Sequence, residues 1–554
     1  MDVTVWRNAI DKKWSSYKEL TKRKVVAQGW RGLGDLSNCF EVPKPTFDTN
    51  IGKRIQALVN PVNQNQENTI NETFWNLLNR LDPGDIVIAT EGLETKGICE
   101  IPTDSEYSFS SDVNHEYAHG VGPVEWHDVE AISEKLRIDK TKLLEKLPNS
   151  RPPGHITRVE KHADEIIEFW TRYRNLCALE KKMQQYVECL KINKQMVLTG
   201  APGTGKTFMA KELASRLTGF SQDTSPDGFK RQVHLVQFHS SYDYPDFIEG
   251  FKPTLSQSNG TMIFELKNGA FKEFCRKAGV IERILFAKAI DQKAASCPKD
   301  VHTNLREFCN GLKEVEPFWK DWLDKQMPES ISKSQENNPN LKSDLDATNS
   351  RLTEALPKFV FIIDEINRAN LSKVFGELMY SLEPDLRGPE GRVKTQYASL
   401  NNDETFFVDK SDDWFFIPSN VYIIATMNEI DRSVEVFDFA MRRRFSWHEI
   451  AADEVMEDVL KKMFEKCPYW DSKIPELLKK AEDLNKFISD QQGLGPHFSI
   501  GPAYFGKIKL YGETEDAYAK LWDNHLHTLL QEYIRGIGYE SSFLDNCKKA
   551  FELK

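Results

Sequence analysis

Gly200-Ala-Pro-Gly-Thr-Gly-Lys206-Thr207 is the stretch that decides the fold of this chain of 554 residues. The apolar run Gln195-Met-Val-Leu-Thr199 precedes it and predicts a strand, and a helical pattern follows over about 207–217. Glycines at these spacings let backbone N–H groups turn inward around phosphate oxygens, and the helix start adds its positive dipole end. The order strand, glycine-rich loop and helix predicts α/β architecture with a parallel sheet and a bound nucleotide.

Two side chains of this loop carry the chemistry. Lys206 is predicted to place a positive charge at the terminal phosphates, and Thr207 to offer its hydroxyl to Mg²⁺. A chance match in a glycine-rich turn is the alternative, and the strand before and the helix after argue against it. The residues predicted to hold the nucleotide are Gly200, Ala201, Pro202, Gly203, Thr204, Gly205, Lys206 and Thr207.

A second apolar run, Phe359-Val-Phe-Ile-Ile363, ends in the carboxylates of Asp364 and Glu365. In open α/β sheets ligands bind at the carboxyl ends of strands, so both side chains are expected beside the phosphates. Asp364 is predicted to hold Mg²⁺ together with Thr207, and Glu365 to orient or deprotonate the attacking water. A solvated acidic turn is the alternative, and the pairing with the phosphate loop argues against it. The residues after Glu365 predict one helix over 366–382.

A third strand, Val421-Tyr-Ile-Ile-Ala425, leads to Asn428, whose amide is expected between the first two strand ends. There it would position the water and contact the γ-phosphate. Three consecutive arginines follow at 442–444. A guanidinium against the γ-phosphate stabilises transition-state charge, whereas a solvated surface or a structural ion pair is the alternative for any one of them.

Composition narrows the class of protein. The net charge of −11 excludes a chain that is basic throughout and coats nucleic acid. The nine cysteines are scattered with no CxxC pair, which argues against a zinc ribbon and suits a reducing compartment. The amino terminus lacks an apolar signal core, and no stretch approaches the roughly 18 apolar residues of a membrane span. We therefore expect a cytoplasmic protein that does not contact a membrane.

The length predicts more than one domain. Residues 1–150 contain short apolar runs between turn residues and predict a separate β-rich domain, although residues 1–30 look helical. Residues 160–450 are predicted to form the nucleotide-hydrolysing domain, with a polar helical insertion at 280–357. The helical pattern over 451–554 predicts a C-terminal lid.

Five motifs in this order resemble the McrB family, the motor subunits of the McrBC modification-dependent restriction system. The resemblance covers about residues 190 to 535. The motifs are Val236–Gly250, Asp364–Met379, Met427–Ser433, Met441–Phe445 and Leu494–Phe505. One departure is Gly501-Pro-Ala-Tyr504, where the family pattern has a His-Ser pair in the middle, and this leaves the role of that lid segment open.

The resemblance implies an AAA+ domain with a helical lid, a ring that is a hexamer, and GTP with Mg²⁺ as the substrate. It also implies that Asn428 and Asp431 carry the family's Met-Asn-x-x-Asp signature and that Arg443 and Arg444 act on a neighbouring protomer's nucleotide. The partner would be an McrC-like protein that stimulates hydrolysis and carries the nuclease, because this chain shows no nuclease motif. The residues alone do not choose guanine over adenine, so ATP stays open.

The amino-terminal segment resembles the EVE/PUA-like β-barrel group in the stretches Pro83–Thr90, Gly97–Ile101 and Gly122–Trp126. That resemblance implies that the domain reads modified double-stranded DNA by holding a flipped base against aromatic side chains. Core packing is the alternative for each aromatic residue. The candidate DNA-binding residues are Trp30, Arg31, Trp75, Tyr117 and Trp126.

Three functions remain open at this point. The first is a GTP-hydrolysing motor that recognises foreign modified DNA and activates a separate nuclease. The second is an AAA+ ATPase of the MoxR type that remodels proteins, which strong ATP preference and indifference to DNA would favour. The third is a nucleotide-gated module that grips nucleic acid without translocation.

Overall fold

The computed structural model describes residues 3–10, 16–40, 42–58, 64–111, 117–148, 156–255, 262–283, 286, 317–325, 355–408, 413–430, 439–514, 516–535 and 542–552. The chain divides into two compact units, Met1–Glu180 and Lys181–Lys554. The division lies inside one long helix, α6 (Ala163–Asn193), and so comes later than the change of sequence pattern between residues 150 and 160.

The first unit is built on a five-stranded sheet in the order β7-β4-β3-β1-β8. Strands β1 and β3 run parallel, and the other neighbours run antiparallel. Side chains alternate along β1, so that Trp6 joins one buried apolar cluster and Val5 another. The sheet is therefore covered on both faces. Its strands are β1 (Val5–Ile10), β3 (Ile86–Glu91), β4 (Glu94–Glu100), β7 (His127–Asp128) and β8 (Ile156–Arg158).

A second, antiparallel sheet in the order β2-β6-β5 confirms that the amino-terminal region is rich in strands. The prediction of a helical segment over residues 1–30 is wrong for Val5–Ile10, because this stretch pairs with β3 some eighty positions away, from Val5 opposite Ile86 onward. The remaining elements are β2 (Val26–Gln28), β5 (Glu106–Phe109), β6 (His119–Gly122), α1 (Tyr17–Arg23), α2 (Lys44–Leu58), α3 (Gln64–Asn79), α4 (Val129–Leu136) and α5 (Lys140–Lys146).

The second unit contains a five-stranded sheet in the order β10-β13-β14-β9-β15, in which every neighbouring pair runs parallel. The central strands are continuous apolar runs, as expected where helices cover both faces of a sheet. This confirms the predicted α/β class. The elements are β9 (Gln195–Gly200), β10 (Val233–Gln237), β13 (Phe359–Asp364), β14 (Val421–Asn428), β15 (Ser446–Glu449), α7 (Lys206–Thr218), α8 (Pro226–Gln232), α9 (Tyr244–Phe247), α10 (Ala270–Ala278) and α18 (Phe439–Arg442).

Most of the predicted insertion at 280–357 lies outside the described residues. One described piece, α13 (Pro317–Lys325), packs against the central sheet. The Trp319 ring stacks on Phe359 with centroids 5.8 Å apart, and its indole N–H donates to the Lys277 carbonyl at 3.0 Å. This piece therefore belongs to the core of the nucleotide domain.

The single helix predicted over 366–382 is wrong, because the segment is broken into short pieces. Asn370 begins the second piece by accepting a hydrogen bond from the Lys373 N–H at 3.1 Å. Gly376 ends it with φ of +49°, and a Cβ there would lie 3.2 Å from the Tyr244 ring. The pieces are Ile366–Arg368, α16 (Leu371–Phe375) and α17 (Leu378–Ser381).

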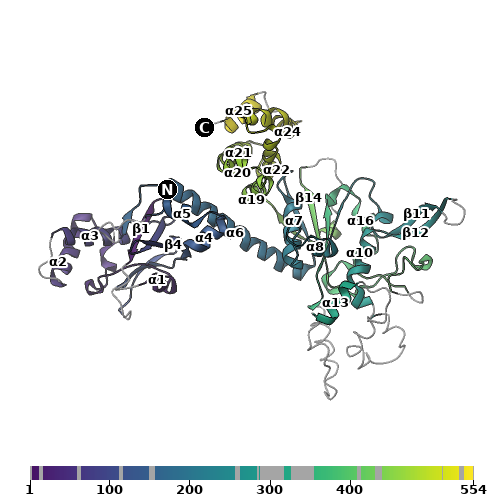
Figure 1. Cartoon of the computed structure of the whole chain (residues 1–554), viewed down its shortest axis with the longest axis horizontal. Coiled ribbons are helices and arrows are strands. Elements are labelled where there is room, and N and C mark those ends of the chain that lie inside the picture. Colours follow the sequence, from purple (N-terminus) through teal and green to yellow (C-terminus); the bar gives the residue numbers. More distant parts are fainter. Residues whose placement is uncertain are drawn as a thin grey trace, which may run out of the picture. The chain divides into compact units, whose positions relative to one another are not determined.

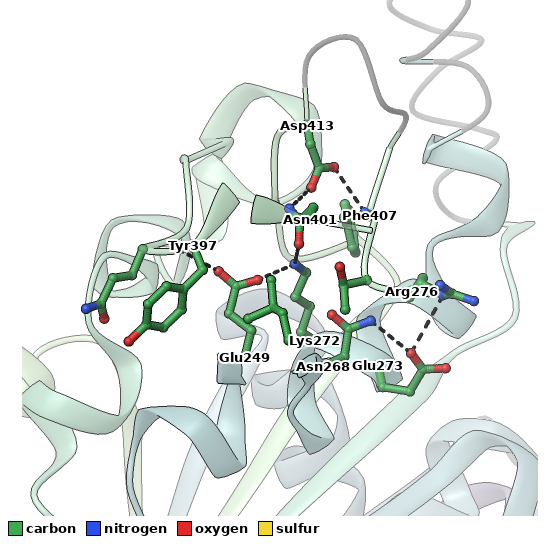
Figure 2. Close-up of polar contacts among 12 residues, drawn as sticks. Glu249, Asn268, Lys272, Glu273, Arg276, Tyr397, Asn401, Phe407 and Asp413 are labelled. Atoms are coloured by element: carbon green, nitrogen blue, oxygen red, sulfur yellow. Dashed lines mark hydrogen bonds and ion pairs between the residues drawn. The ribbon is translucent and has the colours of Figure 1, made fainter. Parts of the chain in front are cut away.

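A hairpin, β11 (Glu249–Leu255) and β12 (Met262–Asn268), extends away from the sheet (Figure 1). The end of the hairpin nearest the sheet is held by a buried network of polar contacts, shown in Figure 2. The Glu249 and Lys272 side chains are both 0% exposed and pair at 2.5 Å, and Lys272 also donates to Asn401 at 3.3 Å. The other Glu249 oxygen accepts from the Tyr397 N–H at 2.9 Å. A buried charge is tolerated only when it is paired and hydrogen-bonded in this way.

The C-terminal region is helical and has an apolar core of its own, as predicted for a lid. None of the helices among the described residues is long and apolar enough to cross a membrane. The lid helices are α19 (Ala452–Phe464), α20 (Pro468–Ser472), α21 (Ile474–Ser489), α22 (Pro502–Phe505), α23 (Ala517–Leu521), α24 (His527–Ile534) and α25 (Ser542–Glu552).

Candidate nucleotide-hydrolysing site

Strand order brings the three predicted motifs to one edge of the sheet. β14 lies between β13 and β9, and Asn428 is in register with Gly200 at the start of the phosphate loop. Asp364 is the last residue of the neighbouring strand β13. Residues separated by more than two hundred positions therefore face the same small region.

The loop backbone adopts the conformation that its glycines permit. Gly203 and Gly205 have φ of +77° and +82°, and α7 begins immediately afterwards at Lys206. The Lys206 ammonium is almost fully buried and donates to the carbonyls of Gly200 at 3.0 Å and Ala201 at 2.7 Å. Burial lowers the pKa of Lys206 to about 8, against the opposing pull of the carboxylates nearby. A buried cation that pairs with carbonyls in the described part of the chain is suited to bind phosphate.

Thr207 and Asp364 lie in direct contact, as the sequence predicts for two Mg²⁺ ligands. The Thr207 hydroxyl donates to Asp364 Oδ1 at 2.8 Å. The same oxygen accepts a hydrogen bond from the Thr426 hydroxyl at 2.6 Å. Carboxylate and hydroxyl oxygens at one point are the ligand type that Mg²⁺ prefers. Sequence reasoning missed Thr426, although a hydroxyl two positions before Asn428 on an apolar strand shares its face.

Glu365 is held in a strained position beside this pair. Its φ is +56°, which is uncommon for a residue with a side chain and recurs at functional sites. The Glu365 N–H donates to the Thr426 hydroxyl at 3.2 Å, and the Asn428 amide donates to Oε1. The second oxygen, Oε2, lies 3.4 Å from Arg368 Nε but accepts no hydrogen bond from the described part of the chain. This oxygen is buried, and its hydrogen-bonding capacity is unused.

The predicted arginines differ in their surroundings. The Arg443 side chain is 69% exposed, whereas that of Arg444 is 11% exposed. Both lie near Glu383. Asp431, predicted to belong to the same site, lies outside the described residues.

The lid contacts the phosphate loop directly. The Ala503 N–H donates to the Gly203 carbonyl at 3.1 Å. A Cβ at Gly501 would lie 2.1 Å from the carbonyl carbon and oxygen of Gly203 and 2.3 Å from the Thr204 nitrogen, so only glycine fits there. The segment that departs from the family pattern, Pro502-Ala503, thus begins α22 directly over the loop.

A second contact from the lid reaches the strand ends. His497 Nδ1 lies 3.1 Å from a carboxylate oxygen of Glu429 and 3.1 Å from one of Glu449. Glu429 follows Asn428, and Glu449 is the last residue of β15. All three side chains are exposed, and they bring lid and sheet into contact at the surface.

Two of the amino-terminal aromatic candidates are buried. Trp126 is 7% exposed, and its indole N–H donates to the Val25 carbonyl at 2.9 Å. Tyr117 is 3% exposed, and its carbonyl accepts from Arg23 at 2.6 Å. Both belong to the apolar core of the first unit.

The other candidates lie nearer the surface. Trp30 is partly buried with φ of +61°, and its carbonyl lies 3.2 Å from His119 Nε2. Arg31 beside it is exposed and donates to the Ser111 carbonyl. Trp75 is partly buried and packs edge-on against Phe47 with centroids 5.2 Å apart. All four aromatic residues thus contribute to one apolar cluster, and a role in DNA binding stays a prediction.

The residues at the strand ends fit a nucleoside triphosphate with Mg²⁺. The loop has glycines where a Cβ would collide, a buried lysine stands at its end, and oxygen ligands converge beside it. A loop and helix start of this kind offer N–H groups and a cation to phosphate, and the oxygens beside them suit the metal.

Two family models match the second unit. The AAA domain (dynein-related subfamily) matches residues 195–283 and 324–445, and the McrB alpha-helical lid domain matches residues 476–538. The chain is 33% identical over 331 residues to the Type IV methyl-directed restriction enzyme EcoKMcrB subunit of Escherichia coli (strain K12), a match covering 59% of this chain and 50% of that protein. It is 24% identical over 290 residues to the Type II restriction enzyme BsuMI component YdiS of Bacillus subtilis (strain 168), covering 51% and 66%.

Among solved structures, a putative ATPase from Cytophaga hutchinsonii matches 67% of this chain and 89% of its own, with 11% identity and a TM-score of 0.23. The chain thus spans half the length of the first relative and 66% of the second.

Proposed function

The chain belongs to the McrB family, and on that premise we propose that it is the nucleotide-hydrolysing AAA+ motor of an McrBC-like, modification-dependent restriction system. The motor uses GTP with Mg²⁺ and assembles as a ring, a hexamer. Its amino-terminal unit reads modified double-stranded DNA, and the ring activates a separate McrC-like nuclease. The chain itself is not expected to cut DNA.

The observation that carries this proposal is the chain of contacts at the strand ends. Thr426 donates to Asp364 and accepts from the Glu365 N–H, so one hydroxyl links the Asp364 carboxylate to the Glu365 backbone. Asn428 then holds one oxygen of Glu365. A binding module that only closes on a nucleotide needs no such orientation of the second carboxylate, whereas hydrolysis does.

Each residue has a role that follows from its contacts. A bound triphosphate with Mg²⁺ supplies the bond to be broken and the cation that neutralises its charge. Lys206 and the loop N–H groups hold the phosphates, while Thr207 and Asp364 offer oxygens to the metal. Glu365 takes the proton of the attacking water on Oε2, and Asn428 holds the carboxylate in place through the other oxygen.

The experiment compares hydrolysis of GTP and ATP by the full chain, with and without the protein of the neighbouring gene. Lys206→Ala serves as the blank, and Glu365→Gln separates hydrolysis from binding because it keeps the size of the side chain. GTP preference, stimulated by the partner, supports the restriction motor. ATP preference that the partner does not change moves the assignment to a protein-remodelling ATPase and contradicts the proposal.

DNA recognition is tested separately on duplexes with and without modified bases. An EVE/PUA-like reader holds a flipped base on an aromatic face, and Trp30 is a partly buried candidate that directly precedes an exposed arginine. Trp30→Ala and Arg31→Ala should weaken binding to one modified duplex relative to its unmodified partner. Equal loss on both duplexes would show a general contact to DNA, and no loss would remove these residues from the proposed interface.

A further inference from the structure

One carboxylate, Glu383, contacts two of the three consecutive arginines. Its Oε1 lies 3.2 Å from Arg444 Nε and 3.7 Å from Arg443 Nη2. Arg444 also donates from Nη1 to the Ala440 carbonyl at 2.5 Å, and its side chain is 11% exposed. Arg444 is thus retained within its own protomer, whereas the Arg443 side chain is 69% exposed and, among the described residues, makes only the longer contact with Glu383.

The third arginine is occupied elsewhere. The Arg442 guanidinium lies over the Trp447 ring, 5.1 Å from its centroid, and the indole N–H of Trp447 donates to the Arg442 carbonyl at 2.9 Å. A cation on an aromatic face in this geometry is attracted by the ring. Of the three, Arg443 is therefore the guanidinium best placed to reach another molecule.

A buried amide fixes the backbone beneath Glu383 and Arg444. Gln195 is 0% exposed, and its Nε2 donates to the Leu382 carbonyl at 2.7 Å and to the Arg444 carbonyl at 2.6 Å. Its oxygen accepts from Arg387. Because Leu382 directly precedes Glu383, this one side chain sets the distance between the carboxylate and the arginines.

We propose that Glu383 is a positioning residue for Arg443. It holds Arg444 within its own protomer and limits the orientations of Arg443, which then points to the nucleotide of the neighbouring protomer. This rests on the proposed ring. An exposed ion pair at this separation is weak, so Glu383 orients Arg443 without preventing it from reaching a phosphate. Without the carboxylate, two adjacent cations repel each other and Arg443 is no longer directed.

The test measures hydrolysis by the full chain carrying Arg443→Ala or Glu383→Gln, each alone and mixed with Lys206→Ala. Loss of a trans-acting arginine costs roughly 1,000-fold in kcat, and Arg443→Ala should show a loss of this order. Mixing restores activity, because a Lys206→Ala protomer still offers Arg443 to an intact loop. Glu383→Gln should lower kcat roughly tenfold to a hundredfold at unchanged KM, as expected for a misplaced group.

Further variants separate positioning from folding. Glu383→Asp should restore most of kcat, and Glu383→Gln should add no further loss on the Arg443→Ala background. Glu390→Gln, an exposed carboxylate in the same segment, is the matched control and should hydrolyse like the parent. Losses that multiply in the double variant would mean that Glu383 acts through the fold, which overturns the proposal.

The two proposals fail in different ways. In one outcome, Glu383→Gln hydrolyses like the parent while mixing Arg443→Ala with Lys206→Ala restores activity. This outcome overturns the role of Glu383 and leaves the proposed ring intact. Absence of complementation, together with absence of nucleotide-dependent oligomers, overturns the ring and the positioning role with it. A parent-like Arg443→Ala variant overturns the choice of Arg443.

Discussion

A methyl group at Gly501 tests whether the lid must touch the phosphate loop. In Gly501→Ala the new Cβ would lie 2.1 Å from the Gly203 carbonyl, where ordinary contact begins near 3.4 Å, so loop and lid must separate by 1.3 Å (3.4 − 2.1). The atoms that it meets are backbone and cannot turn aside as a flexible side chain does. The Gly501 backbone itself, with φ of −82°, accepts alanine without strain. Overpacking of this kind costs about 1–3 kcal/mol.

The separation also removes the hydrogen bond from the Ala503 N–H to the Gly203 carbonyl, which is 3.1 Å long. A displacement of about 1 Å at a catalytic loop lowers rate by up to roughly 100-fold. We therefore expect Gly501→Ala to lower kcat for nucleotide hydrolysis and to weaken nucleotide binding, with the far-ultraviolet circular dichroism unchanged. Steady-state hydrolysis and titration with a fluorescent nucleotide measure the two effects.

Gly495 supplies the matched control in the same lid motif. A Cβ there meets nothing within 4 Å, and its φ of 164° is extended backbone that any residue adopts. Gly495→Ala should bind and hydrolyse like the parent. If Gly501→Ala also did so, the lid contact would be dispensable and the reasoning from close approach would be refuted.

Three further outcomes follow from the buried groups. Lys272→Met should lower the free energy of unfolding of the second unit, measured by urea titration, by about 3–5 kcal/mol, because it leaves the buried Glu249 carboxylate without its counter-ion. The double variant Lys272→Met/Glu249→Leu should recover most of the lost stability. Thr426→Val should lower kcat roughly tenfold or more with little change in nucleotide affinity, since it releases Asp364 while keeping the side-chain shape. Burial lowers the pKa of His119 from 6.5 to about 4, so the unfolded chain binds this proton more readily. The first unit should lose about 3 kcal/mol of stability as pH falls from 6.5 toward 4, and His119→Gln should remove that slope in urea titrations at several pH values.

The nucleotide site was predictable because its parts are local. The chemistry of a glycine-rich loop after one strand, and of carboxylates at the end of another, can be recognised within a few residues of sequence. Parallel strands then bring these strand ends together. Thr426 was not predictable in the same way, because a lone hydroxyl on an apolar strand gains meaning only when Asp364 lies beside it. The break in the helix after Glu365 depends on Tyr244, which approaches Gly376 from more than a hundred positions away.

The contact between lid and loop could not be predicted from the sequence for the same reason, since Gly501 and Gly203 are separated by almost three hundred positions. Glycine at 501 reads as a turn residue, whereas its structural role is to let two backbones meet.

Strand β9 shows how such long-range contacts combine. Its last residue, Gly200, opens the phosphate loop, and its first, Gln195, is a fully buried amide that fixes the arginine-bearing segment. One strand therefore positions both the loop that binds a protomer's own nucleotide and the guanidinium proposed to act on the neighbour's. The sequence marks only the first of these, because glycine-rich loops have a pattern and a glutamine at the start of an apolar run has none. The strands of a parallel sheet have an amino end and a carboxyl end, and side chains at either end can position neighbouring segments. Here the carboxyl end carries the phosphate loop, and the amino end fixes the segment that carries the second half of the proposed composite site.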